Sequence, residues 1–112
     1  MYLPAPDEAL LVGVLRMVLR IPGSRSLKDR RRVVWSLRDR VVARHRAAFA
    51  EVGHLENLQA AVVAISVVGN DARQVRARLD TIRGDAELTL EAHVTEVNVW
   101  IVPMNSHTLD PT

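Results

Sequence analysis

The sequence predicts an α+β fold in which two helices cover one face of a four-stranded antiparallel sheet. Four segments are either strongly apolar or alternate between apolar and polar residues, as strands do. Two other segments carry an apolar stripe at helical spacing. The order is βαββαβ, and right-handed crossovers in such a chain place both helices on the same face. This arrangement is the ferredoxin-like fold.

The length of 112 residues suffices for one domain with a substantial core, which we place at residues 9–102. Residues 1–8 are expected to form a flexible leader, and residues 103–112 a flexible tail. The absence of cysteine excludes disulfides, thiolate zinc sites and a cysteine nucleophile. The apolar run at residues 10–15 is too short to span a bilayer, and no cationic segment of a signal peptide precedes it. We therefore expect a cytoplasmic protein.

The first strand is predicted for residues 9–21. Its odd positions from 11 to 19 are apolar or glycine and should face inward, whereas Arg16 and Arg20 lie on the other side of a two-residue period. A Pro-Gly-Ser sequence at residues 22–24 then ends the strand.

The first helix should begin after Ser26 and run to about His45. Ser26 and Asp29 match a capping box, in which the Ser26 hydroxyl accepts a hydrogen bond from the Asp29 amide and the Asp29 carboxylate reaches back. One helical stripe is apolar and should be buried. It contains Leu27, Val34, Leu37 and Val41.

Three further strands complete the predicted sheet, at residues 47–53, 59–69 and 92–102. The middle one is almost entirely apolar, as expected for a central strand. The last one alternates apolar with polar residues until Trp100, so one side of it should face the core. Its inward set contains Val97, Val99 and Ile101, and its outward set contains Glu96, Asn98 and Trp100.

The second helix is predicted from Asp71 to about Arg83. Asn70 and Asp71 offer a helix start, and Gly84 followed by Asp85 is expected to stop the helix. Its buried stripe should contain Val75, Leu79 and Ile82.

The charge of the chain is unevenly distributed. Of its 15 lysines and arginines, ten lie between Arg20 and Arg46, a segment that holds only two acidic residues and therefore carries a net charge of +8. The rest of the chain carries −6. A basic face on an acidic remainder favours binding of an anion in one orientation, and nucleic acid backbone is the obvious one.

Several segments are similar to a known family. The stretch LRIPGSRSLKDRRRVVWSL, the sequence AEVGH, then Gln59 and AVVAISVVGND resemble the YlxP-like family of small bacterial proteins, a domain of unknown function. The resemblance covers residues 11–101 and implies a ferredoxin-like fold. Family genes often lie beside genes for translation initiation and ribosome-binding factors, which implies a link to the ribosome, and no catalytic residues are established for the family. The chain has Leu58 where family members often carry an aromatic residue.

The turn before the first helix is the strongest candidate for a binding site. Unpaired amides at a helix start, two serine hydroxyls and Arg25 together could hold a phosphate, and further cations on the helix could follow a nucleic acid backbone. Such binding would weaken steeply with salt. The alternative is that Ser26 only caps the helix and the arginines only solvate it. The candidate phosphate-binding residues are Ser24, Arg25, Ser26, Lys28, Arg31, Arg32 and Arg38.

Aromatic residues suggest two further surfaces. Trp35 lies off the apolar stripe and could stack on an unpaired base, although such a residue more often packs under arginine stems at the rim of the core. The sheet face without helices should expose Phe49 and Trp100 on outer strands, and these could be buried in a homodimer. The central strands offer no aromatic residue to this face, which argues against base recognition there. The other residues expected on it are Arg16, Arg20, Glu51, Ser66 and Asn98.

Catalysis and metal binding find little support. His54, Glu56 and Glu51, with Asp71 nearby, could bind a metal or move a proton, but their spacing matches no metal motif and short polar turns gather such residues for solvation. Phosphate-loop and dinucleotide-binding glycine motifs are missing, as is the glycine-rich turn of acylphosphatases, which share this fold. We expect no catalytic residue, metal or cofactor.

The sequence thus predicts a non-enzymatic RNA-binding accessory protein that acts on ribosomal RNA or a ribosomal particle. Phosphate contacts from the basic helix and the preceding turn would position the protein without recognising sequence. The alternative is a homo-oligomeric interaction module of unknown role whose basic helix docks an acidic protein.

Overall fold

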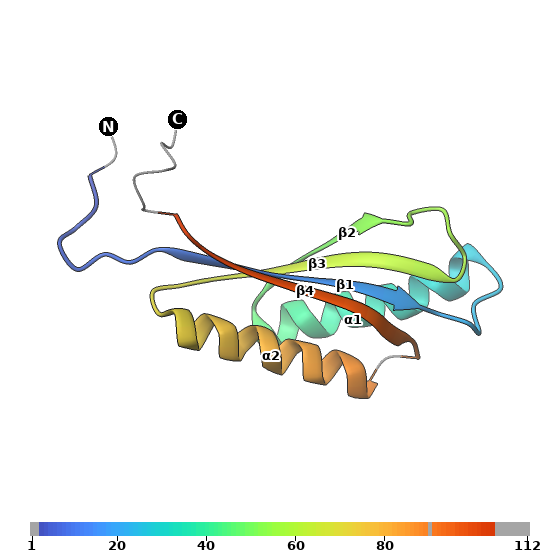
Figure 1. Ribbon diagram of the computed structural model, residues 1–112. Helices are drawn as coiled ribbons and strands as arrows, with labels where there is room; N and C mark the ends of the chain where they lie inside the picture. The colour runs from blue at the N-terminus through green and yellow to red at the C-terminus, as the bar shows by residue number, and fades with distance from the viewer. Residues whose placement is uncertain (1–2, 90, 105–112) are drawn as a thin grey trace.

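The computed structural model describes residues 3–89 and 91–104 and confirms the predicted fold (Figure 1). The four strands form one antiparallel sheet in the order β2-β3-β1-β4. Both helices lie on the same face of this sheet, and the described residues place no helix on the opposite face, which we call the open face. The elements are β1 (Leu11–Arg20), α1 (Leu27–His45), β2 (Ala48–Gly53), β3 (Ala60–Gly69), α2 (Ala72–Thr89) and β4 (His93–Pro103).

The core lies between the sheet and the two helices. On β1, Leu15, Met17 and Leu19 are fully buried, and each pairs with a buried residue of β3 at the same level of the sheet. The alternation predicted for the first strand is therefore confirmed. Helix α2 approaches β1 so closely that a Cβ atom at Gly13 would lie 2.5 Å from a methyl carbon of Val75. Glycine at this position allows the helix to pack directly on the strand.

Helix α2 continues beyond its predicted end. The sequence placed the stop at Gly84 and Asp85, whereas the helix runs to Thr89. Glycine within a helix costs only about 1 kcal/mol relative to alanine. Ile82 and Ala86 on either side of Gly84 are buried against the core, and Asp85 contacts His45 of α1. Tertiary packing therefore overrides the local signal to stop.

The predicted position of Phe49 was wrong. Phe49 pairs with Ile65 of β3 and packs against the core on the helix side of the sheet, and Glu51 pairs with Val63 on that same side. β2 thus has the opposite orientation to the one predicted, and the small residues Ala48 and Ala50 occupy its open face. A strand whose inward set is one phenylalanine and one glutamate gives no clear apolar alternation.

The two ends of the chain extend the sheet slightly. Pro103 pairs with Leu11, and the Met104 amide donates a hydrogen bond to the Leu10 carbonyl at 2.8 Å, so these residues do not belong to a tail as predicted. Before β1, the Ala5 amide donates to the Glu8 carboxylate within a turn of the exposed leader. The remainder of the predicted tail, residues 105–112, lies outside the described residues, as do residues 1 and 2.

Candidate nucleic-acid interface

The outward side of α1 carries a groove lined in part by an aromatic side chain, which we call the α1 groove. Lys28, Arg31, Arg32 and Trp35 line it together with Asp29, and its volume is about 450 Å³. Steps of three and four residues place these side chains on one side of the helix. Trp35 is 47 % exposed, as its position off the apolar stripe predicted. The groove therefore combines an accessible indole ring with cations.

Trp35 is also in contact with an arginine of the next turn. The Arg38 guanidinium carbon lies 5.2 Å from the centre of the Trp35 ring, and Arg38 forms an ion pair with Asp39 at 3.0 Å. This cation–π contact is the rim packing considered from the sequence. The exposed fraction of Trp35 shows that ring surface nevertheless remains accessible to a ligand, so both interpretations of Trp35 stay open.

Much of the positive charge on α1 is neutralised within the protein. Arg32 holds Glu91 through two hydrogen bonds of 2.9 and 3.3 Å, and these raise the pKa of Arg32 and lower the pKa of the Glu91 carboxyl. Arg40 and Arg44 lie 3.6 and 3.9 Å from Asp85. Together with Glu51, these carboxylates from outside the basic segment reduce its charge from +8 to +5.

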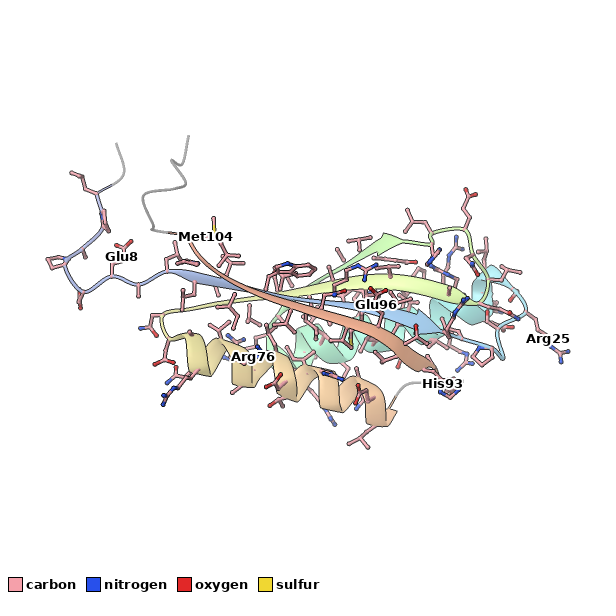
Figure 2. All side chains as sticks on the ribbon, viewed as in Figure 1. Glu8, Arg25, Arg76, His93, Glu96 and Met104 are labelled. Carbon is pink, nitrogen blue, oxygen red and sulfur yellow. The ribbon has the colours of Figure 1, made fainter. Side chains whose placement is uncertain are left out.

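Three exposed cations near the start of α1 keep their charge available. Arg25, Lys28 and Arg31 form no ion pair within residues 3–89 and 91–104. Arg25 extends away from one end of the molecule (Figure 2). Lys28 and Arg31, three residues apart on the helix, line the α1 groove, and Arg25 lies in the turn just before the helix.

The turn before α1 is organised differently from the predicted phosphate site. Ser24 is only 2 % exposed, and its hydroxyl donates to the Ser26 carbonyl at 3.1 Å. The Ser26 hydroxyl caps the helix by accepting from the Asp29 amide at 3.1 Å. The Asp29 carboxylate accepts from the Arg25 amide at 3.0 Å and brings negative charge to the helix start. The predicted cap is confirmed. Ser24 is too deeply buried for its hydroxyl to reach a phosphate, whereas the exposed Ser26 hydroxyl still has a hydrogen to donate and its phosphate-binding role stays a prediction.

One arginine of the basic run is buried and has a structural role. Arg30 is 2 % exposed, and its guanidinium forms an ion pair with Glu51 of β2. It also donates to the carbonyl oxygens of Ala60 at 3.0 Å and His54 at 2.8 Å. Arg30 thus joins α1 to the ends of β2 and β3. Its position three residues after Leu27 and four before Val34 places it on the apolar stripe, a signal that the sequence analysis missed.

The buried Arg30 contact joins the segment SLKDRRRVV, at residues 26–34, to the segment AEVGH, at residues 50–54. A family model described as "Protein of unknown function (DUF503)" matches residues 12–99. The chain belongs to the DUF503 family. No curated protein matches the chain. The DUF503 region contains all of α1, so it includes both the buried Arg30 and the exposed α1 groove.

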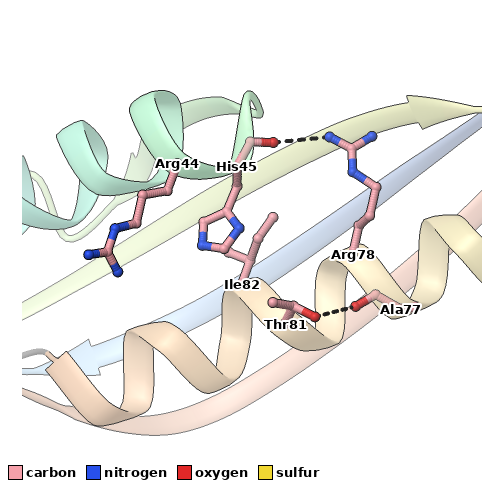
Figure 3. Close-up of a pocket in the computed structure, with 6 residues that line it drawn as sticks. All are labelled: Arg44, His45, Ala77, Arg78, Thr81 and Ile82. Atoms are coloured by element: carbon pink, nitrogen blue, oxygen red, sulfur yellow. Dashed lines mark hydrogen bonds between the residues drawn. The ribbon is translucent and has the colours of Figure 1, made fainter.

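A second hollow of the DUF503 domain lies between the two helices (Figure 3). Its volume is about 290 Å³, and Arg44, His45 and Arg78 line it with Ala77, Thr81 and Ile82. Arg78 donates to the backbone carbonyls of His45 at 3.0 Å and Val68 at 3.4 Å. His45 contacts the Asp85 carboxylate at 3.0 Å. These hydrogen bonds join α1 to α2, so the side chains around this hollow hold the two helices together.

The polar cluster around His54 does not assemble in the DUF503 domain. Glu51 is engaged by Arg30, and the His54 carbonyl accepts from the same guanidinium. Asp71 caps α2 by accepting from the Gln74 amide at 3.1 Å, at the opposite end of β3 from His54. Across residues 3–89 and 91–104, no group of three histidine or acidic side chains could hold a metal ion. No helix in that part of the chain is both long and apolar enough to cross a membrane.

Proposed function

We propose that this protein is a non-enzymatic RNA-binding accessory protein of the YlxP-like bacterial type, acting on ribosomal RNA or a ribosomal particle. The observation that carries the proposal is the α1 groove, in which Trp35 is half exposed beside Lys28 and Arg31. An aromatic face next to cations without ion pairs matches the chemistry of a nucleotide, which has a planar base and a charged phosphate.

The proposed contacts divide between two kinds of side chain. Arg25, Lys28 and Arg31 bind successive phosphates, and these contacts orient the protein without recognising sequence. An unpaired base stacks on the accessible surface of Trp35. Arg32 and Arg38 contribute less than the sequence suggested, because Glu91 and Asp39 already occupy their guanidinium groups. The acidic remainder of the chain restricts binding to one orientation.

A titration with fluorescently labelled ribosomal RNA fragments, single-stranded and structured, tests the proposal at two salt concentrations. Three phosphate contacts on single-stranded RNA give a salt slope of about −2, which is roughly a 20-fold loss of affinity for a fourfold rise in salt. The double variant K28A/R31A should lose roughly tenfold in affinity and reduce this slope by about 1 or more. Arg73→Ala, which removes an exposed arginine of α2, is the matched control and should bind RNA like the wild type.

The bidentate pair between Arg32 and Glu91 favours one alternative function, docking of an acidic protein segment. A segment of this kind would offer carboxylates to the same α1 groove. Polyglutamate therefore serves as the second ligand in the titration. RNA binding that clearly exceeds polyglutamate binding supports the proposal. Equal binding of both polymers would favour the acidic-protein interpretation, and wild-type RNA affinity in K28A/R31A would reject the α1 groove as the RNA site.

A further inference from the structure

The open face of the sheet is largely apolar although the described residues leave it uncovered. Val68 is 58 % exposed, Val52 54 %, Trp100 48 % and Val102 37 %. On β3, every residue that faces this side is apolar or a serine. A continuous apolar surface that spans several strands is typical of a protein contact.

Two features of the open face lie on the same row across the sheet. The register pairs Trp100 of β4 with Val14 of β1, Val14 with Ser66 of β3, and Ser66 with Ala48 of β2. At the Ala48 end of this row the small side chains leave a hollow of about 240 Å³. At the other end lies the large Trp100 side chain, about half of which is exposed. The hollow is lined by Val14, Ala48, Phe49, Ala50, Ala64, Ile65 and Ser66.

A two-fold axis brings these features together. Consider an axis that lies above the open face, parallel to the strands and midway between β3 and β1. Because the strand order is β2-β3-β1-β4, rotation about this axis places the partner's β1 over β3 and the partner's β4 over β2. The rotation does not change the position of a residue along the strand direction, so the residues of one row face the same row of the partner. The partner's Trp100 then lies directly over Ala48 and Ser66, and the contact is formed twice because a two-fold interface is isologous. Face-to-face sheets are separated by about 10 Å, a gap that large side chains fill.

We propose that a second copy of this chain covers the open face, with Trp100 of each copy inserted into the hollow of the other. The result is a four-layered homodimer in which the two sheets are central and the helices are outside. The surface is self-complementary, since one row supplies both the inserted and the receiving residue. A second copy is thus the occupant that the register itself specifies.

The charged residues on the open face are compatible with burial in this interface. Arg16 donates to Asn98 at 2.9 Å and lies 3.4 Å from the Glu96 carboxylate, so its charge is already paired within one copy. Burial of Arg16 therefore leaves no isolated charge, which would otherwise be strongly destabilising, and Arg20 lies at the end of β1, where it is exposed. Glu96 lies within β4, an edge strand of the sheet, where it pairs with Val18 of β1, and its side chain is exposed (Figure 2).

The area of the face sets the expected strength of the dimer. Strands of about ten residues at about 3.3 Å each, spaced about 4.8 Å apart, give roughly 500 Å² per copy and about 1,000 Å² in total. This is the lower limit of a specific protein interface. We therefore expect dissociation in the micromolar range. The α1 grooves would lie on the two outer faces, free to bind RNA bivalently.

Sedimentation equilibrium or light scattering from about 1 µM to about 500 µM tests the proposal. The wild type should change from monomer to dimer over this range. Trp100→Ala removes the inserted side chain, and Ala48→Trp fills the hollow; each should weaken dimerisation at least tenfold. Trp100 and Ala48 are exposed, so neither change enters the core, and circular dichroism verifies folding. Val42→Asp, at a position 51 % exposed on α1, is the control and should dimerise like the wild type.

The double variant A48W/W100A separates this register from general hydrophobic association. It exchanges the inserted residue and the hollow between β2 and β4, so dimerisation should return towards the wild-type level. An equimolar mixture of the two single variants should form a heterodimer for the same reason. A wild type that stays monomeric at about 500 µM, single variants that dimerise normally, or a double variant that stays monomeric would each overturn the proposal.

Discussion

Arg30 and Arg31 are neighbours in a run of three arginines, yet they belong to two different regions of the molecule. Arg30 is 2 % exposed and binds Glu51 and two backbone carbonyls at the junction of α1, β2 and β3. Arg31 lines the exposed α1 groove. One step of about 100° around the helix separates a structural cation from a cation available to a ligand. A basic run in a sequence therefore overstates the charge that a partner can meet.

The largest expected effect is a loss of stability when the buried Arg30 is replaced. Arg30→Met leaves Glu51 without its partner and removes one donor from each of the Ala60 and His54 carbonyls, and removal of one partner from a buried ion pair typically costs about 3–5 kcal/mol. Arg31→Met removes an exposed side chain without an ion pair in the described chain and should change the free energy of unfolding by about 0.5 kcal/mol or less. Urea denaturation of the two variants measures the difference. Equal stability of R30M and R31M would contradict the structural role of Arg30.

The next largest effect concerns RNA affinity at the exposed end. Trp35→Ala should weaken RNA binding by about 1–3 kcal/mol, which is the usual contribution of base stacking on an aromatic ring. Val42→Ala, on the same helix and similarly exposed, is the control and should leave binding unchanged. RNA titrations at one fixed salt concentration and urea denaturation are both needed. If W35A binds RNA normally and only loses stability, Trp35 is rim packing for Arg38 and not a stacking platform.

The sequence predicted the fold well because two periodicities determine it. The alternation in β1 and the apolar stripe of α1 are each long, and their order in βαββαβ leaves few topologies. The short β2 was oriented incorrectly, because Phe49 and Glu51 share its inward side and Glu51 is paired only through Arg30, which is distant in the sequence. Local patterns do not reveal such a partner.

The candidate site was predictable only in part. The position of Trp35 off the apolar stripe and the basic character of α1 follow from helical spacing. The burial of Ser24 and the ion pair between Arg32 and Glu91 do not follow from helical spacing, because both depend on contacts between segments that are distant in the sequence. Arg32 and Glu91 are 59 residues apart. Charge in a sequence predicts a basic face, while tertiary ion pairs decide which members of it remain available.

The smallest expected effects, on stability at low pH and on RNA affinity, concern the ion pair between Arg32 and Glu91. Arg32 holds the pKa of the Glu91 carboxyl below its usual value, so this pair stabilises the protein above the ordinary pKa of glutamate, about 4.3. That contribution is lost as the pH falls through the lowered pKa. Because both side chains are well exposed, the change in stability should be small.

Glu91→Gln removes the charge without a large change in shape and releases Arg32 into the α1 groove. RNA affinity should then rise about two- to threefold at low salt, and the salt slope should steepen slightly, because one more cation can bind a phosphate. Glu87→Gln, which removes a carboxylate paired with Arg83 on α2, is the matched control and should leave the affinity unchanged. An equal rise in RNA affinity in both variants would indicate a general effect of net charge. Arg32 would then be, like Arg30, a cation with a role only within the folded protein.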